Sequence, residues 1–123
     1  MSKTCIRVLA DPVQIKECKQ AIQSLEEPLA DVTRVFNLAG NAARLKILYL
    51  LSREGEMCPC DFSDILEISV GGVSQHLRKL KDGGLVQSKK VGQTVFYSIP
   101  ENKMTMLNTL IELLIQKEKH LTI

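Results

Sequence analysis

The chain has 123 residues, of which 45% are hydrophobic, 4% aromatic and 24% charged, and its formal net charge is +2. This length suits one domain, and the apolar content can form a buried core, which excludes an intrinsically disordered chain. No apolar run approaches the ~20 residues that a membrane helix needs, and the N-terminal residues lack the apolar segment of a signal peptide. We therefore expect a cytoplasmic protein whose four cysteines are reduced thiols or metal ligands rather than disulfides.

The first part of the chain predicts two helices. Asp11 followed by Pro12 is typical of a helix start, and apolar residues at helical spacing predict a first helix to about Leu25. Glu26-Glu27-Pro28 is expected to interrupt it. A second helix is predicted over about Pro28–Leu38, because its apolar residues recur three and four positions apart.

A third and a fourth helix follow. Asn41 is a good cap for a third helix that runs to about Arg53, with Gly55 placed to end it. This helix is apolar on more than one side, which predicts the central core helix. Cys58-Pro59-Cys60-Asp61 predicts the start of a short fourth helix, because proline is favoured at the first helical position and an acidic residue in the first turn.

The short helix is predicted to end at Leu66 and to face the core with Phe62, Ile65 and Leu66. Glu67-Ile68-Ser69 then predicts a tight turn, with Ser69 as the cap of the next helix. That fifth helix is expected over Val70–Asp82, ending at Gly83-Gly84. Its apolar face holds three residues, and the other faces are polar and basic. The three apolar residues are Val73, Leu77 and Leu80.

The last part of the chain predicts a β-hairpin and a helix. The runs Leu85–Lys90 and Thr94–Ile99 are rich in β-branched and aromatic residues and flank Val91-Gly92-Gln93. Pro100 is expected to start a final helix to about Lys119, with a broad apolar stripe. We interpret the stripe as a homodimer contact, and the alternative is packing within one chain.

The order of these elements predicts a mainly α protein with a β-hairpin. A short helix, a tight turn and a polar helix form a helix-turn-helix, and the hairpin after it forms a wing. We therefore predict a homodimeric winged helix-turn-helix protein. The single domain of residues 1–123 would comprise an N-terminal arm and first helix (1–27), a DNA-binding core and wing (28–99) and a C-terminal dimerisation helix (100–123).

The helix and hairpin also hold most of the positive charge. Residues 70–95 carry five Lys or Arg and one Asp, whereas residues 1–69 carry eight Lys or Arg and ten Asp or Glu. Such clustering is typical of a phosphate-binding surface, and the alternative is a solvated basic face. The polar helix offers side chains for base edges in the major groove, and the hairpin offers side chains for phosphate or the minor groove. The candidate DNA-binding residues are Ser74, Gln75, His76, Arg78, Lys79, Lys89, Lys90 and Gln93.

These segments together resemble the ArsR/SmtB family of transcriptional repressors over roughly residues 29–115. The resemblance is carried by Ala42–Leu48, Glu56–Asp61, Val73–Leu80, Gly84–Val86 and Gly92–Ser98. It implies a homodimer that binds double-stranded operator DNA and leaves it when a metal or metalloid ion binds. It also implies that the protein is not an enzyme.

The resemblance points to thiols as the sensor. The Cys-x-Cys-Asp motif of the family matches at Cys58 and Cys60, but the third cysteine of family arsenite sensors is replaced here by Ser63. Cadmium- and lead-sensing members complete this site with N-terminal cysteines across the dimer, which here would be Cys5 and Cys18. The family's zinc site on the last helix is absent, since its positions hold Glu101, Lys103, Leu114 and Lys117.

The chemistry of the four cysteines agrees with a soft ion. Thiolates bind soft ions, and a helix N-terminus stabilises a thiolate through its exposed N–H groups. Arsenite, cadmium, lead, zinc and mercury all stay open as the inducer. One alternative is a repressor of the same fold that senses oxidation or sulfur species. A thiol oxidoreductase is a further alternative, but Cys-Pro-Cys is shorter than the redox spacing and no βαβ pattern surrounds it.

Overall fold

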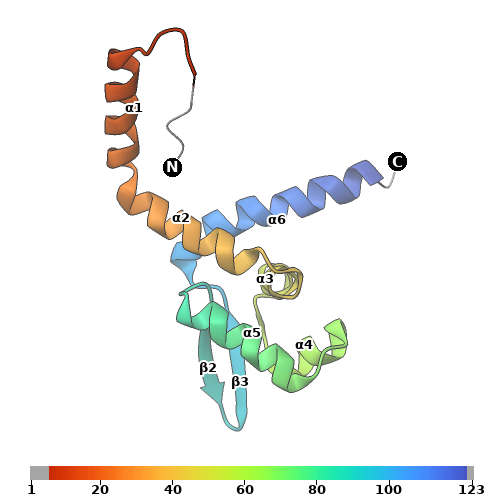
Figure 1. The fold of residues 1–123 in the computed structure, drawn as a ribbon. Helices are drawn as coiled ribbons and strands as arrows, with labels where there is room; N and C mark the ends of the chain where they lie inside the picture. The colour runs from red at the N-terminus through yellow and green to blue at the C-terminus, as the bar shows by residue number, and fades with distance from the viewer. Residues whose placement is uncertain (1–5, 122–123) are drawn as a thin grey trace. The chain divides into compact units, whose positions relative to one another are not determined.

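The computed structural model describes residues 6–121, and the side chains of residues 6–118. Helices dominate this part of the chain, and three short strands form one antiparallel sheet (Figure 1). In chain order the elements are α1 (Pro12–Ser24), α2 (Glu26–Ala39), α3 (Ala42–Glu54), β1 (Glu56–Met57), α4 (Pro59–Leu66), α5 (Val70–Asp82), β2 (Gln87–Val91), β3 (Thr94–Ser98) and α6 (Glu101–Leu121). The predicted winged helix-turn-helix fold is confirmed.

The contacts within the chain divide it into two compact units, residues 1–33 and residues 34–123. The boundary lies inside α2. The first unit therefore holds α1 and the start of α2, and the second holds all the elements of the winged helix-turn-helix. The expectation of one domain over 1–123 stays a prediction.

The start of α1 follows the predicted cap. The Asp11 carboxylate accepts hydrogen bonds from the backbone N–H groups of Val13 and Gln14, at 3.0 and 3.1 Å. The predicted interruption is shorter than expected, because α2 begins at Glu26 rather than Pro28. Proline is tolerated there because the first-turn N–H groups of a helix have no partner within the helix.

The core of the second unit lies between α3, α5 and α6. The central role predicted for α3 is confirmed, because this helix contacts α5, α6 and β1. The predicted apolar face of α5 is confirmed as well, since its three residues are fully buried. The most deeply buried side chains of these helices are Ile47, Leu48, Leu51, Val73, Leu77, Leu80 and Leu107.

The helix-turn-helix is formed by α4 and α5, with the turn between them as predicted. Glu67 adopts the left-handed conformation at φ 57°, and the Ser69 hydroxyl accepts a hydrogen bond from the N–H of Gly72 at 3.1 Å. Phe62 is fully buried, but Ile65 is 53% exposed, so the prediction that Ile65 faces the core is wrong. Phe62 and Leu66, four positions apart, form the inward face of this short helix, and Ile65 lies beside that face.

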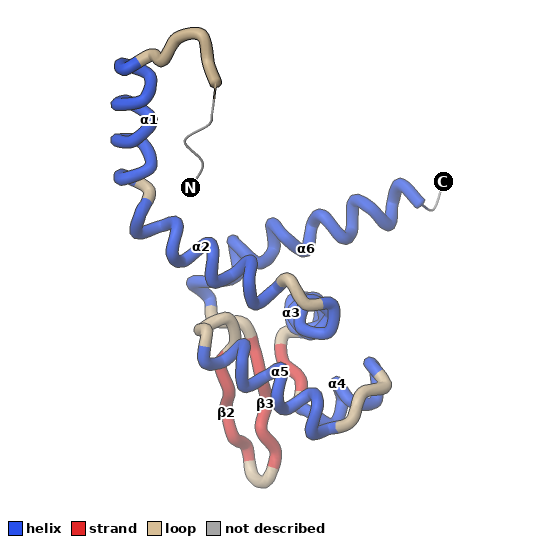
Figure 2. The backbone as a smooth tube through the Cα atoms, in the orientation of Figure 1, coloured by secondary structure: helices blue, strands red, loops and turns tan. Residues whose placement is uncertain are grey.

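The wing is a hairpin of β2 and β3, in which Val91 pairs with Thr94 across a turn of Gly92 and Gln93. Gly92 has φ 64°, a conformation that glycine adopts without strain and that two-residue hairpin loops require. The sequence did not predict the third strand, β1, which pairs with β3 so that Met57 lies opposite Tyr97. The strand order is β1-β3-β2, as Figure 2 shows.

The final helix, α6, begins one residue after the predicted Pro100. Its stripe divides between two environments. Leu107 and Ile111 are buried, whereas Leu114 is 41% exposed. In the part of the chain that the structure describes, no helix is long and apolar enough to cross a membrane.

Candidate nucleic-acid interface and thiol site

The outer face of α5 carries most of the predicted DNA-binding side chains. Ser74, Gln75, Arg78 and Lys79 are exposed, and the buried residues of the same helix hold it against the core. The Ser69 cap satisfies a backbone donor at its start, and Gly83 caps its end. The structure thus presents a fixed row of donors and acceptors, as a helix needs if it is to enter a major groove.

The predicted wing residues are exposed as well. Lys89 and Lys90 follow each other on β2, and Gln93 lies in the hairpin turn. The Lys89 ammonium lies 3.6 Å from the Glu56 carboxylate, an exposed ion pair that contributes little stability. The wing therefore offers two cations and an amide beside the polar helix.

An open hollow of about 440 Å³ lies between α5 and the wing. Its lining is mainly polar and comprises Ser74, Gln75, Arg78, Lys81, Asp82 and Tyr97. Lys81 and Tyr97 were not among the residues predicted from the sequence. Lys81 carries a readable signal, because it lies seven positions after Ser74 on the same face of the helix. Tyr97 carries no such signal in the sequence, because the side of the sheet that it faces depends on the register between the strands.

His76 differs from the other side chains of α5, because it is half-buried. Burial lowers the pKa of His76 below its ordinary value of 6.5, and the positive charges of Arg44 and Lys79 lower it further. The imidazole is therefore neutral at neutral pH and offers one donor and one acceptor.

This pKa shift predicts a loss of stability in mild acid. Below about pH 6.5 the unfolded chain takes up a proton at His76 that the folded chain resists, so the free energy of unfolding falls as the pH falls. The loss is absent above that window. Urea unfolding of the free protein at a series of pH values should show this fall in the free energy of unfolding. His76→Gln should reduce the slope of that free energy against pH. Equal slopes in the two proteins would contradict the assignment to His76.

Cys58 and Cys60 lie at the N-terminus of α4. Cys58 is the N-cap, with φ −95° and ψ 161°, and its side chain makes no cap hydrogen bond. Pro59 occupies the first helical position, as predicted, and Cys60 follows it. Both thiols are free, with Cys58 half-buried and Cys60 exposed.

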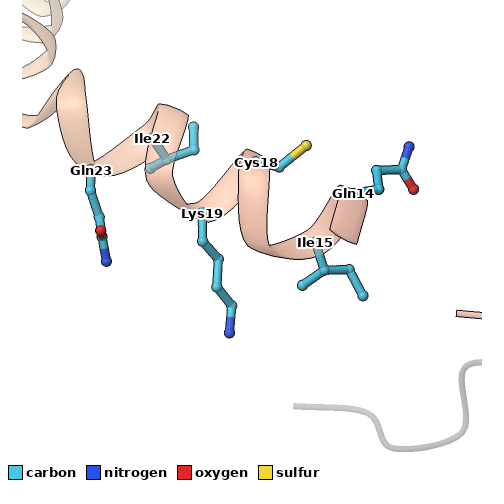
Figure 3. Close-up of a pocket in the computed structure, with 6 residues that line it drawn as sticks. All are labelled: Gln14, Ile15, Cys18, Lys19, Ile22 and Gln23. Carbon is cyan, nitrogen blue, oxygen red and sulfur yellow. The ribbon is translucent and has the colours of Figure 1, made fainter. Parts of the chain in front are cut away.

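A third candidate thiol, Cys18, belongs to the first unit. Cys18 is exposed on α1, where Figure 3 shows its sulfur pointing away from the helix. An open hollow of about 510 Å³ runs along this helix and is lined by Gln14, Ile15, Cys18, Lys19, Ile22 and Gln23. Cys5 lies outside the described residues. Within the described residues of one chain, no three His, Cys, Asp or Glu side chains are grouped to hold a metal ion.

Two connections join the start of α4 to the DNA-binding elements. The residue before Cys58 is Met57, which pairs with Tyr97 of the wing through β1. The Ser63 hydroxyl, in α4, donates a 2.5 Å hydrogen bond to the carbonyl of Ile68, in the turn that leads into α5. A displacement at the Cys58–Cys60 end of α4 therefore has a short covalent and hydrogen-bonded route to both the wing and α5.

Comparisons with known proteins agree with this geometry. Residues 41–88 match the model of a family described as "Bacterial regulatory protein, arsR family". A cadmium resistance transcriptional regulatory protein CadC homolog of Staphylococcus aureus is 42% identical over 77 residues, which are 63% of this chain and 64% of that protein. The match thus spans just under two thirds of that relative.

A second relative and a solved structure extend the likeness. The cadmium resistance transcriptional regulatory protein CadC of Listeria innocua is 34% identical over 94 residues, 76% of this chain and 77% of that protein. The structure of reduced HlyU from Vibrio cholerae superposes with a TM-score of 0.67 at 34% identity, covering 74% of this chain and 96% of that one. The chain therefore belongs to the ArsR family of DNA-binding bacterial transcriptional regulators.

Proposed function

We propose that this chain is a cytoplasmic, homodimeric repressor that binds operator DNA and releases it when its cysteines bind a soft metal or metalloid ion. The observation that carries the proposal is the position of two free thiols, Cys58 and Cys60, at the N-terminus of α4. This helix is the first of the helix-turn-helix. The relatives named for cadmium resistance support the same reading.

DNA binding is assigned to α5 and the β2–β3 wing. In a helix-turn-helix protein the second helix lies in the major groove, and its first residues contact base edges. Ser74, Gln75 and Arg78 have the chemistry for base edges or phosphate, and the neutral His76 adds one donor. Lys89 and Lys90 would contact phosphate from the wing.

A homodimer accounts for apolar side chains that one chain leaves exposed. Large contiguous apolar patches on a soluble protein mark interaction sites. Leu114 on α6 is 41% exposed and lines an open, mainly apolar hollow with Leu45 and Ile115. Two copies of α5 on a two-fold axis would reach successive major grooves of a palindromic operator.

The donor set fits a soft ion but is incomplete in one chain. Two thiolates at one helix N-terminus have the softness that arsenite, cadmium, lead or zinc prefers. Coordination of such an ion requires three or four thiolates, and Ser63 stands where a third cysteine of α4 would be. We assign the remaining ligands to Cys5 and Cys18, which a second copy can supply.

Release follows from the way α4 is held. Cys58 follows β1, which pairs with the wing, and Ser63 bonds to the turn that leads into α5. Thiols drawn towards a shared ion would reposition α4, and α5 and the wing would move with it. Such coupling between two sites is typically 1–3 kcal/mol, or about 5–150-fold in affinity.

The test measures release from DNA across a panel of ions. The probe is a duplex selected by the wild-type protein from random-sequence DNA, and the readout is fluorescence anisotropy. We expect at least one of arsenite, Cd²⁺, Pb²⁺ and Zn²⁺ to weaken the affinity about 5–150-fold. Thiolate charge-transfer absorption should appear at the same ion concentration.

Substitution of the thiols then decides their role. In the variant with both Cys58→Ser and Cys60→Ser, the ion should leave the DNA affinity unchanged. Cys5→Ser and Cys18→Ser, tested singly, should each weaken the response if that thiol is a ligand. The proposal fails if the double variant is released from DNA as the wild type is.

A second candidate is a repressor that senses oxidation or sulfur species through the same thiols. It is favoured by the exposure of Cys60 and Cys18, since accessible thiolates are the ones that oxidise. The likeness to a structure described as reduced HlyU points the same way. Release by peroxide or persulfide, with no response to any of the ions, would support this candidate over the first.

A further inference from the structure

The hollow between α5 and the wing is a preformed polar site, and half of its lining residues are absent from the DNA contacts predicted from the sequence. It combines residues of two elements: one face of α5 and one side chain of β3. Lys81, Asp82 and Tyr97 are its three members that have no assigned role. Their surroundings indicate what the hollow binds.

Tyr97 packs against the core and also lines the hollow. The residue is half-buried, and its apolar part packs against the core cluster. It lies opposite Ser88 on β2 and opposite Met57 on β1, in the middle of the three-stranded sheet. A tyrosine with a packed ring usually directs its hydroxyl to a polar partner. The hydroxyl is therefore a donor whose position is set by the sheet.

Lys81 is held in place as well. Its ammonium group donates a 2.7 Å hydrogen bond to the Ser88 hydroxyl, which joins the end of α5 to the wing. An ammonium group has three donors, so two remain for a ligand. Arg78 adds a second positive charge to the lining, and Asp82 is the one negative charge among the six residues. The hollow therefore has a net positive charge and an excess of donors.

We propose that this hollow binds one phosphate group of the DNA backbone, with the Tyr97 hydroxyl and the Lys81 ammonium group as donors. The inference rests on the proposed DNA binding and names the part of the DNA that this site takes. Phosphate is favoured over a base edge because Lys81 lies in the last turn of α5, whereas base edges meet the first turns of such a helix. Contacts of this kind fix the register of a protein on the duplex.

The first test compares two tyrosine variants on the selected duplex. Tyr97→Phe keeps the ring and removes the hydroxyl, so each half-site should lose about tenfold in affinity with a hydrogen bond to a charged group, and the dimer about a hundredfold. The fall should be equal on random-sequence DNA. Tyr49→Phe is the matched control, because Tyr49 is the other tyrosine of the chain and lies in α3, beside α6. The affinity of the Tyr49→Phe variant for both DNA duplexes should stay at the wild-type value.

The second test locates the phosphate. Duplexes are made with a single neutral methylphosphonate at each position in turn. With wild-type protein, several positions should lower the affinity, and one of them in each half-site should be the phosphate that the hollow holds. With Tyr97→Phe the loss at that position should shrink, while losses elsewhere stay the same. Lys81→Gln should reduce the loss of affinity at the same position. It should also lower the slope of log affinity against log salt concentration by about one unit per site.

These results separate the inference from the function on which it rests. If the wild-type protein binds no duplex, the proposed DNA binding fails. If it binds, but Tyr97→Phe keeps the wild-type affinity or leaves the methylphosphonate pattern unchanged, the phosphate site is wrong. If inorganic phosphate alone saturates the free protein and Tyr97→Phe abolishes this without affecting DNA binding, the hollow binds a free anion and the inference is again overturned.

Discussion

Replacing Phe62 with alanine is expected to lower the free energy of unfolding by about 3–5 kcal/mol. Phe62 is fully buried and is the one buried residue of α4. Alanine would leave a cavity between α4 and the core, and the neighbouring side chains relax only partly into such a space. The loss is a large share of the roughly 5–15 kcal/mol that stabilises a typical domain. Urea unfolding followed by circular dichroism measures it.

Ile65 provides the control on the same helix. It is 53% exposed, so Ile65→Ala removes little buried surface and should cost less than about 1 kcal/mol. The two variants lose side chains from one short helix of eight residues, so a difference between them reports burial rather than helix propensity. Equal losses would show that Phe62 does not anchor α4 to the core.

The helix boundaries were largely predictable because they depend on local chemistry. Asp11 and Asn41 cap the helices that they were predicted to cap, and Gly55 ends α3 at φ 92°. Each of these signals acts within a few residues, so no knowledge of the fold is required. The start of α2 was misplaced because the first turn of a helix tolerates a proline, and Pro28 alone does not mark a boundary.

The features that the sequence did not predict depend on contacts between distant residues. β1 comprises only Glu56 and Met57, which is too short for any alternation of side chains. It is a strand because Ser98 and Tyr97 lie opposite it in β3. The same pairing decides which side of the sheet Tyr97 faces, and so the hollow beside α5 was not predictable.

The candidate sites divide in the same way. The exposed face of α5 was predictable, because a helix with Val73, Leu77 and Leu80 buried must turn its other residues outward. The thiol pair at the start of α4 was predictable from the proline between the two cysteines. A complete ligand set was not, because the described residues of one chain group no three candidate ligands together, and Cys5 lies outside those residues.

Replacing Gln75 with alanine should produce the largest loss in sequence-specific DNA binding. Gln75 is exposed in the first half of α5, where a bidentate contact with an adenine is worth about 1–3 kcal/mol. A dimer makes the contact twice, so we expect a loss of about 2–6 kcal/mol on the selected duplex and little loss on random-sequence DNA. Anisotropy titrations with both duplexes at one salt concentration measure the difference.

Lys90→Ala is the comparison for Gln75→Ala on the same two duplexes. Lys90 is exposed on the wing, and a lysine that neutralises a phosphate contributes equally on any sequence. Its loss should weaken both duplexes alike and lower the salt dependence by about one unit for each contact. A loss confined to the selected duplex in Gln75→Ala, beside an equal loss on both duplexes in Lys90→Ala, would assign base recognition to α5 and phosphate binding to the wing. If Gln75→Ala weakened both duplexes equally, Gln75 would contact the backbone, and base readout would have to come from its neighbours Ser74 and Arg78.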